Sequence, residues 1–322
     1  MEQLLSLLKT IPEYAAMVSS LQDGESVAVT GIGQINRSHM IAGLCRSLNR
    51  PMVVLCQDDL AARRLQEELK GFLADTAPIL PGRDLTLYDA AVVSRSWEQK
   101  RLRQLYDLAT GKTGLQIMTW ESLILRTMPK AALLAAAFSL EVGREYAVED
   151  LISRLTAAGY NRCGMVEGPG QFAVRGGILD IFSPAEDRPV RAEFFGDELD
   201  TMGFFDPATQ RRSENITSVT VLPVAETQPG LHPGGVEGLC KDITSLISRQ
   251  KRRKNINEPL IATLEKDLNK YESGLHNPAS DRYMALIYPE MATAADYIPD
   301  GAVVAVCDHG NLQRAARSRC DE

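Results

Sequence analysis

Three short runs of almost purely apolar residues limit what this chain can fold into. Two of them, residues 52–56 (MVVLC) and 115–120 (LQIMTW), lie in the first part of the chain, and residues 301–307 (GAVVAVC) lie near its end. Amphipathic stretches with helical spacing surround them. Strands that are apolar on both faces are typical of parallel sheets covered by helices. The sequence therefore predicts an α/β domain whose parallel sheet is completed by the late strand.

A different pattern occupies the middle of the chain. From residue 160 to 224, apolar and polar residues alternate with a period of two, and Gly and Pro residues separate the runs. This alternation is typical of an antiparallel sheet. The strands are expected at 160–167, 171–175, 178–182, 190–195, 199–205 and 216–222. Helices are expected at 36–48, 95–110, 147–158, 236–254, 258–272 and 311–319, with Asp58 capping a further helix that buries Leu60.

These patterns predict a discontinuous α/β domain that is interrupted by an α+β insertion. Residues 1–127 form the first part of the α/β domain, residues 128–225 form the insertion, and residues 226–322 return to complete the α/β domain. The length of 322 residues agrees with two domains of about 150 residues each.

Composition excludes several classes of protein. Hydrophobic residues make up 44% and charged residues 24%, which are ordinary globular values and exclude disordered, collagen-like and coiled-coil chains. The six cysteines and four histidines show no clustered ligand spacing, so we expect no metal site and a reducing, cytoplasmic compartment. No apolar stretch approaches the roughly 18 residues that span a bilayer, so no membrane association is expected.

The charge balance argues against a general DNA-binding protein. The net charge is −7, and phosphate contacts need clustered cations. The one cationic cluster is residues 249–254 (RQKRRK). It is read either as a solvated helix end, where cations complement the helix dipole, or as a contact for an acidic partner or DNA.

A strand is expected at residues 26–30, and the strand–turn–helix pattern at 27–48 has the position of a phosphate-binding loop but lacks its chemistry. The template G-x-x-x-x-G-K-[ST] begins here at Ala28 and keeps Gly33, but Gln34 replaces the lysine and Ile35 the hydroxyl residue. The late strand ends at Asp308 without a following acidic residue. We therefore predict a degenerate nucleotide site without catalytic residues or a bound cofactor, in which the turn serves the fold or offers backbone N–H groups to an anion.

The densest signature resembles a known family. It consists of residues 160–162 (YNR), 170–182 (GQFAVRGGILDIF), 189–198 (PVRAEFFGDE) and 205–211 (FDPATQR). This signature resembles the N-terminal module of the bacterial transcription-repair coupling factors, a module similar to part of the excision-repair helicase UvrB. The Thr-Gln-Arg ending favours the coupling factors. The resemblance extends more weakly over almost the whole chain.

The resemblance implies that the insertion docks UvrA, the damage-recognition ATPase. The residues expected at this interface are Arg162, Phe172, Arg175, Arg191 and Glu193. UvrB has an arginine at the position of Ala173, so part of the contact is missing here. The residues alone also allow a purely structural role, in which Phe172 shapes the sheet and Arg175 satisfies turn carbonyls. Glu193 pairs either with Arg191 in its own sheet or with a cation of the partner.

The implied function is a non-catalytic adaptor that links UvrA to stalled RNA polymerase. ATP, Mg²⁺, DNA and RNA polymerase would be bound by other domains of a longer parent protein, whose C-terminal part would mask the UvrA surface. UvrB's tyrosine-rich hairpin is replaced by the short region 80–97 with the single Tyr88. The alternative is a nucleotide-dependent DNA helicase fragment related to UvrB, which rests on the α/β architecture.

Overall fold

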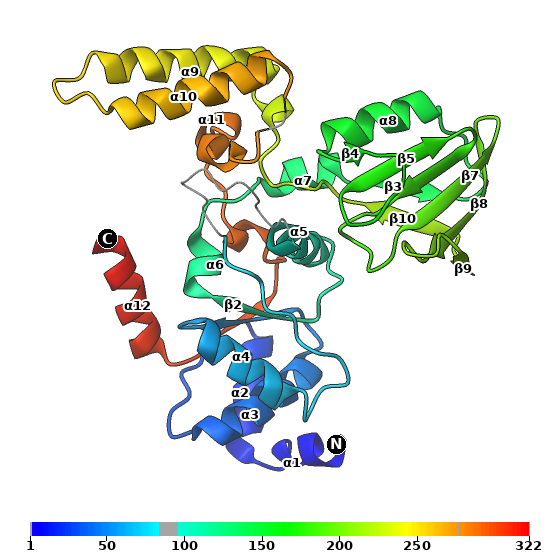
Figure 1. Cartoon of the computed structure of the whole chain (residues 1–322). Coiled ribbons are helices and arrows are strands. Elements are labelled where there is room, and N and C mark those ends of the chain that lie inside the picture. Colours follow the sequence, from blue (N-terminus) through cyan, green and yellow to red (C-terminus); the bar gives the residue numbers. More distant parts are fainter. Residues whose placement is uncertain (1, 84–95, 276, 322) are drawn as a thin grey trace. The chain divides into compact units, whose positions relative to one another are not determined.

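The computed structural model describes residues 2–83, 96–275 and 277–321, so Tyr88 and most of the region around it lie outside the described residues. The chain folds into two compact units, each built from segments that are separate in sequence. Unit 1 contains the residues up to 82, residues 104–125 and the residues from 293 onward, and unit 2 contains the remainder. Figure 1 traces the chain through both units from blue to red.

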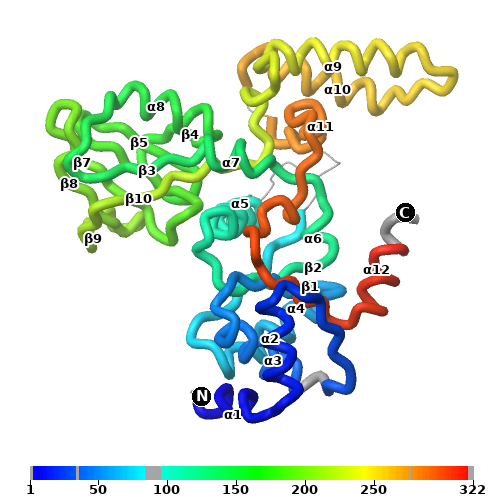
Figure 2. The backbone as a smooth tube through the Cα atoms, turned by 180° about the vertical axis from the view of Figure 1, so that it is seen from behind, coloured from blue at the N-terminus to red at the C-terminus, as the bar shows by residue number. Residues whose placement is uncertain are grey.

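A three-stranded parallel sheet forms the centre of unit 1. Its order is β11 (Val303–Val306), β1 (Met52–Cys56) and β2 (Leu115–Thr119). Met52 pairs with Leu115 on one side and with Val303 on the other. Every residue of β1 and β2 is buried, as expected of strands covered on both faces. The prediction that the late apolar run completes the first sheet is confirmed, and Figure 2 shows this returning segment beside β1.

Helices connect the strands of unit 1. They are α1 (Glu2–Leu8), α2 (Pro12–Gln22), α3 (Gln34–Leu48), α4 (Asp59–Leu69), α6 (Trp120–Ile124) and α12 (His309–Asp321). The predicted cap of α4 is confirmed, because the Asp58 carboxylate accepts a hydrogen bond of 2.8 Å from the Ala61 backbone N–H. Leu65 and Leu69 of α4 are buried, but the prediction for Leu60 was wrong: its first-turn side chain is 59% exposed.

The strand predicted at residues 26–30 does not form. Residues 25–33 adopt neither helix nor strand, and Val27 and Val29 stay exposed. The segment lines a cavity of about 710 Å³ opposite β11 instead of bonding to that strand. The sequence has the apolar alternation of a strand, but this segment makes no ladder with the neighbouring strand, and the alternation alone does not fix a strand.

A six-stranded sheet dominates the insertion in unit 2. Its order is β4 (Asn161–Arg162), β5 (Gln171–Arg175), β6 (Ile178–Ile181), β7 (Val190–Phe195), β8 (Glu198–Phe205) and β9 (Arg212–Asn215). The strands are antiparallel except for the β4–β5 pair. The predicted antiparallel insertion is confirmed, although β4 is shorter than expected and β9 was not predicted.

A small cluster of Val166, Ala173, Phe182 and Phe205 packs on part of one face of this sheet, whereas the main core covers the other face. Helix α8 (Val148–Ala157) and the antiparallel pair β3 (Phe138–Glu141) and β10 (Ser218–Val221) complete its core. Leu155 of α8, Phe172 of β5 and Leu179 of β6 have no exposed surface there. Since side chains alternate along a strand, the residues between these core positions lie on the opposite face, which is called the outward face below.

The helical part of unit 2 contains α5 (Ser96–Ala109), which spans the boundary between the units, α7 (Lys130–Ala136), α9 (Gly235–Lys251), α10 (Glu258–Glu272) and α11 (Met284–Ile287). Helices α9 and α10 lie side by side as an antiparallel pair in both views (Figures 1 and 2). They bury Leu239 and Ile243 from α9, and Ile261 and Leu264 from α10. Residues 226–292 thus group with the insertion, and the chain rejoins unit 1 at Thr293 rather than at the expected residue 226.

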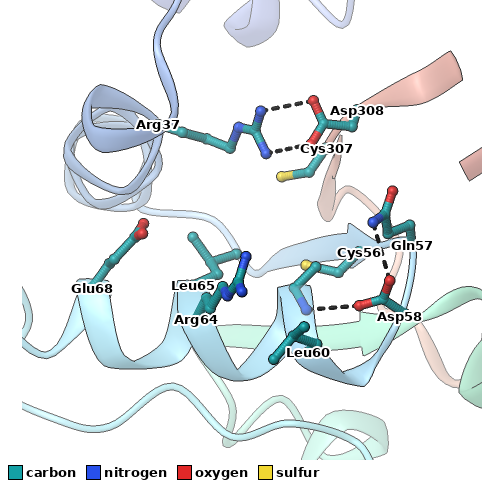
Figure 3. A pocket seen from close by; sticks show the side chains of 11 residues that line it. Arg37, Cys56, Gln57, Asp58, Leu60, Arg64, Leu65, Glu68, Cys307 and Asp308 are labelled. Atoms are coloured by element: carbon teal, nitrogen blue, oxygen red, sulfur yellow. Dashed lines mark hydrogen bonds and ion pairs between the residues drawn. The ribbon is translucent and has the colours of Figure 1, made fainter. Parts of the chain in front are cut away.

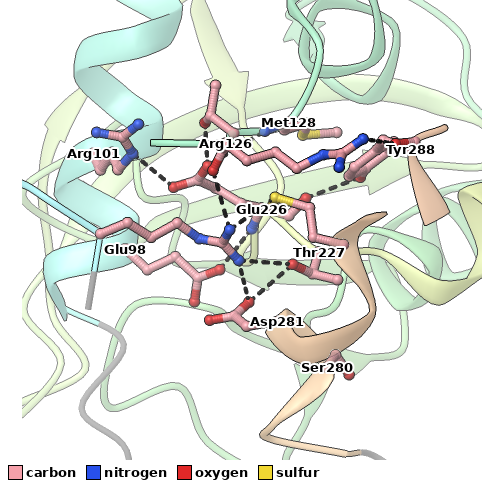
Figure 4. A network of polar contacts seen from close by, with 12 residues as sticks. Glu98, Arg101, Arg126, Met128, Glu226, Thr227, Ser280, Asp281 and Tyr288 are labelled. Carbon is pink, nitrogen blue, oxygen red and sulfur yellow. Dashed lines mark hydrogen bonds and ion pairs between the residues drawn. The ribbon is translucent and has the colours of Figure 1, made fainter. Parts of the chain in front are cut away.

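A buried polar network within unit 2 explains this difference in boundary (Figure 4). The Glu226 side chain is 1% exposed and accepts a hydrogen bond of 2.9 Å from Arg101 Nε and another from Thr127 Oγ1. The Tyr288 hydroxyl donates to the Glu226 carbonyl at 2.9 Å. Thr227 bonds to Asp281, which also pairs with Arg83. These contacts fix the chain, where it leaves the insertion, to the helical part of unit 2.

Candidate functional site

The register of the six-stranded sheet places residues of β5 to β8, most of them polar, in two adjacent rows on the outward face. The first row is Ala173, Asp180, Arg191 and Gly203, and the second is Arg175, Ile178, Glu193 and Thr201. Three of the predicted site residues therefore lie together, because Arg175, Arg191 and Glu193 come from β5 and β7 on either side of β6.

A single buried carboxylate holds two arginines. Arg191 donates from Nε and Nη2 to the two oxygens of Asp180, at 2.7 and 2.9 Å, and Arg175 donates from Nη2 to Asp180 Oδ2 at 2.6 Å. The Asp180 side chain is 1% exposed. The hydrogen bonds between Arg191 and Asp180 raise the pKa of the Arg191 guanidinium above its ordinary value. We call Arg175, Asp180 and Arg191 the arginine cluster.

Gln210 holds Arg191 from the other side. Its carbonyl accepts a hydrogen bond from Nη1 and its side-chain oxygen one from Nη2, each 3.1 Å long. Gln210 has a φ of 59°, which is unusual for a residue other than glycine. The guanidinium also lies 4.5 Å from the centre of the Phe205 ring. Arg191 therefore uses four of its five N–H donors inside the chain.

Arg175 and Arg191 differ in how many of their N–H donors remain available to a partner. The Arg191 side chain is 15% exposed, whereas the Arg175 side chain is 47% exposed and donates one hydrogen bond within the described part of the chain, to Asp180. Arg175 thus keeps most of its planar donor fork available for a carboxylate from outside the chain. Arg191 is largely committed to holding the cluster together.

Glu193 does not pair with Arg191. Its carboxylate accepts a hydrogen bond of 2.9 Å from Arg212 Nη1, which also donates to Thr201 Oγ1 at 3.0 Å. Of the two alternatives for Glu193, the pairing with Arg191 is therefore wrong, because Asp180 and Gln210 occupy that guanidinium and Arg212 reaches Glu193 from β9.

Gly203 gives Arg212 the space to cross the sheet. A Cβ atom at this position would lie 2.6 Å from Arg212 Nε and 2.6 Å from the Glu214 carbonyl oxygen. We expect Gly203→Ala to displace Arg212 and lower the free energy of unfolding by about 1–3 kcal/mol, the usual range for overpacking. Urea unfolding measures this change. Gly164→Ala is the control, since its Cβ would meet nothing within 4 Å; equal effects of both variants would contradict the role of Gly203.

Two other predicted residues lie outside the two rows. Phe172 has no exposed surface and belongs to the core, so its assignment to a partner contact is corrected. Arg162 is exposed on the edge strand β4, where the register places it beside Phe172. Its side chain forms no hydrogen bond or ion pair with another residue that the structure describes.

Sequence reasoning missed an exposed aromatic residue. Phe195 is 84% exposed at the end of β7, next to the turn made by Gly196 with its φ of 64°. The preceding Phe194 packs against the core. The signal was available in the sequence, because two successive phenylalanines in a strand must point to opposite faces.

The residues expected at the degenerate nucleotide site are only partly brought together. Asp308 follows β11 and accepts two hydrogen bonds of 2.8 Å from Arg37 of α3 (Figure 3). Ala28 lies in the segment that forms no strand, Gly33 precedes α3, and Gln34 and Ile35 are its first residues. The strand–turn–helix expected of a phosphate-binding loop is therefore absent.

The Arg37–Asp308 pair borders a cavity of about 320 Å³ that Cys56 and Cys307 also line. The hydrogen bond from Cys56, together with Arg37, lowers the pKa of the Cys307 thiol. Across residues 2–83, 96–275 and 277–321, no group of three His, Cys, Asp or Glu side chains is arranged to hold a metal ion. The Asp308 carboxylate forms its ion pair with Arg37 of the same chain.

None of the helices in the described ranges combines the length and apolarity needed to cross a bilayer.

The insertion is similar to a known protein family. Residues 138–226 match the family of the UvrB interaction domain. This range includes the arginine cluster, Glu193, Arg212 and Phe195.

Known transcription-repair-coupling factors are similar over a longer stretch. The one from Bacillus subtilis (strain 168) is 25% identical over 308 residues, which are 94% of this chain and 26% of the relative. The one from Myxococcus xanthus is 33% identical over 221 residues, which are 66% of this chain and 18% of the relative. The chain thus spans about a fifth to a quarter of the length of these relatives. Together the matches show that the chain is similar to part of the transcription-repair-coupling factors and that its residues 138–226 are similar to the UvrB interaction domain.

Proposed function

We propose that this chain is an adaptor module that binds UvrA through the outward face of its six-stranded sheet. The observation that carries the proposal is the arginine cluster, in which a buried carboxylate orients Arg175 while nearly half of that side chain stays exposed. The UvrB interaction domain match and the coupling-factor relatives support UvrA as the partner. In this role the module would link UvrA to stalled RNA polymerase in the cytoplasm.

The partner surface should offer a carboxylate and an apolar pocket. Arg175 suits a bidentate contact with a carboxylate, and the exposed Phe195 ring suits a pocket, since arginine and aromatic residues supply most strong interface contacts. Ala173 is 1% exposed and adds no polar group at the position where UvrB has an arginine. The contact proposed here therefore depends more heavily on Arg175 and Phe195.

We expect Phe195→Ala to weaken UvrA binding by about 1–3 kcal/mol, or roughly 5- to 150-fold, with an unchanged free energy of unfolding. The ring is 84% exposed in the free chain, so its loss removes little packing. Titration calorimetry with UvrA and urea unfolding measure the two quantities. Met291→Ala is the matched control, because Met291 is 74% exposed in unit 2 and lies outside the insertion. Equal binding by Phe195→Ala and the unaltered chain would remove Phe195 from the interface.

We propose further that the chain itself does not hydrolyse ATP. The segment that would bind phosphates lacks its strand. Arg37 donates two hydrogen bonds to the Asp308 carboxylate, which is the group that would bind Mg²⁺ in a working site. The alternative, a nucleotide-dependent helicase fragment, requires ATP-dependent phosphate release by the isolated chain. Absence of release with and without DNA is the expected result, and DNA-stimulated release would favour the helicase reading.

The remaining partners belong to the longer protein of which we infer this chain to be a module. There, RNA polymerase, DNA, ATP and Mg²⁺ would be bound by other domains. We propose that the C-terminal part of that protein covers the outward face until repair begins. Deletion of this module should then raise the ATPase activity of the full protein, and unchanged activity would argue against the masking.

A further inference from the structure

The turn between α9 and α10 concentrates positive charge at the end of the helix pair. Arg249 and Lys251 lie in the last turn of α9, and Arg252, Arg253 and Lys254 follow before α10 begins at Glu258. All five side chains are exposed. The net charge of the whole chain, −7, includes these five cations, so the other residues together are more acidic than that total. Residues 249–254 are called the cationic turn below.

Most of these charges have no counter-charge among the residues that the structure describes. Lys251 pairs with Glu265 of α10 at 2.8 Å. The side chains of the other four cations form no hydrogen bond or ion pair with a residue in the described ranges; they are Arg249, Arg252, Arg253 and Lys254. Like charges so close together repel one another, and a turn that only joins two helices does not need them.

The helix dipole accounts for only part of the cluster. Cations in the last turn of a helix are stabilised by its negative end, which explains Arg249 and Lys251. Arg253 and Lys254 lie beyond that end and precede the positive end of α10, where Asn257 already caps the helix with its side chain. Their charge is therefore not explained by the local backbone.

The side chains of the turn are suited to phosphate groups. The sequence RQKRRKNIN offers long flexible cations but no aromatic residue on which a base could stack. Such a set contacts the backbone of a nucleic acid without reading its sequence. An acidic peptide would in addition need a pocket for its side chains, and the one apolar residue of the sequence at 249–257 is Ile256, which is 50% exposed.

We propose that the cationic turn binds the phosphate backbone of double-stranded DNA. This contact is separate from the docking of UvrA and requires only the α9–α10 pair. It also reconciles an acidic chain with DNA, because a local cluster of cations, not the net charge, determines phosphate contacts.

The strength of the contact follows from the number of free cations. Binding should weaken as the salt concentration rises. For four phosphate contacts, a plot of the logarithm of the association constant against the logarithm of the salt concentration should have a slope of about −3.6. Sequence-independent binding of this kind has a Kd of roughly 10⁻⁴ to 10⁻⁶ M at physiological salt. Varying the sequence of the duplex should change neither value.

Fluorescence anisotropy of a labelled duplex of about 20 base pairs, titrated with the whole chain at 50–200 mM salt, tests the proposal. A variant with Arg249, Arg252, Arg253 and Lys254 changed to Gln should bind at least about tenfold more weakly and lose most of the salt slope. A control variant with Gln at Lys9, Arg63, Arg64 and Lys241 changes the net charge equally at exposed positions elsewhere. It should bind like the unaltered chain.

Three results would overturn the proposal. One is the absence of salt-dependent binding by the unaltered chain. Another is an equal loss in the two variants, which would assign binding to net charge. The third is displacement of the duplex by poly-glutamate as effectively as by unlabelled DNA, which would indicate an acidic protein as the partner. UvrA is absent from every arm, so none of these results bears on UvrA docking.

Discussion

Arg175→Ala should weaken the binding of UvrA by about 2–5 kcal/mol, which is roughly 30- to several-thousand-fold in Kd. The guanidinium is 47% exposed and oriented by Asp180, so it reaches a partner carboxylate with little loss of conformational freedom. Its removal leaves Asp180 paired with Arg191, and the free energy of unfolding should change by less than about 1 kcal/mol. Titration calorimetry and urea unfolding of the same preparations measure both.

Arg144→Ala is the matched control for this variant. Arg144 also pairs with one carboxylate, Glu141, and its side chain is 67% exposed in the same insertion. The change in net charge is identical, but Arg144 lies outside the two rows of the outward face. Equal binding by the Arg175 and Arg144 variants would show that Arg175 makes no contact of its own.

The largest change in stability is expected from Asp180→Asn. This variant leaves the poorly exposed Arg191 guanidinium without its negative partner, and breaking such a pair from one side costs about 3–5 kcal/mol. Arg191→Ala leaves the buried carboxylate with Arg175 alone, so it too should be destabilising. The two losses should not add in the double variant, because both remove the same contact. Urea unfolding of the four proteins provides the cycle.

Asp187→Asn provides the control for Asp180→Asn. Asp187 accepts a hydrogen bond of 2.7 Å from Arg103, but its side chain is 86% exposed, so water replaces the lost contact. The expected loss is less than about 1 kcal/mol. If both asparagine variants unfold at the same urea concentration, Asp180 does not hold the arginine cluster.

Much of the fold could be predicted because its signals are local. The runs that became β1, β2 and β11 are apolar at nearly every position, which is typical of parallel strands. The strand predicted at residues 26–30 failed because a strand needs a bonded neighbour, which the sequence does not reveal. The short β9 was missed because its residues, Arg212–Asn215, lack apolar alternation.

The site was predictable in part. The resemblance to the coupling factors indicated Arg175 and Arg191, but not the contacts that distinguish them. Those contacts come from Asp180, Gln210 and Arg212, which reach the arginines or Glu193 across strands and turns. Asp180 carries a local signal, because a carboxylate inside an apolar strand (ILDI) needs a partner when buried. Naming that partner requires the register of β6 and β7.

Site-specific cross-linking tests the central claim, that UvrA docks on the outward face, most directly. A photo-reactive phenylalanine analogue would replace Phe195 in one preparation and Met291 in another, both highly exposed positions. Irradiation with UvrA should give a cross-linked product from position 195 and none from position 291. A chain that binds UvrA but cross-links only from position 291, or fails to bind UvrA at all, would contradict the proposed docking face.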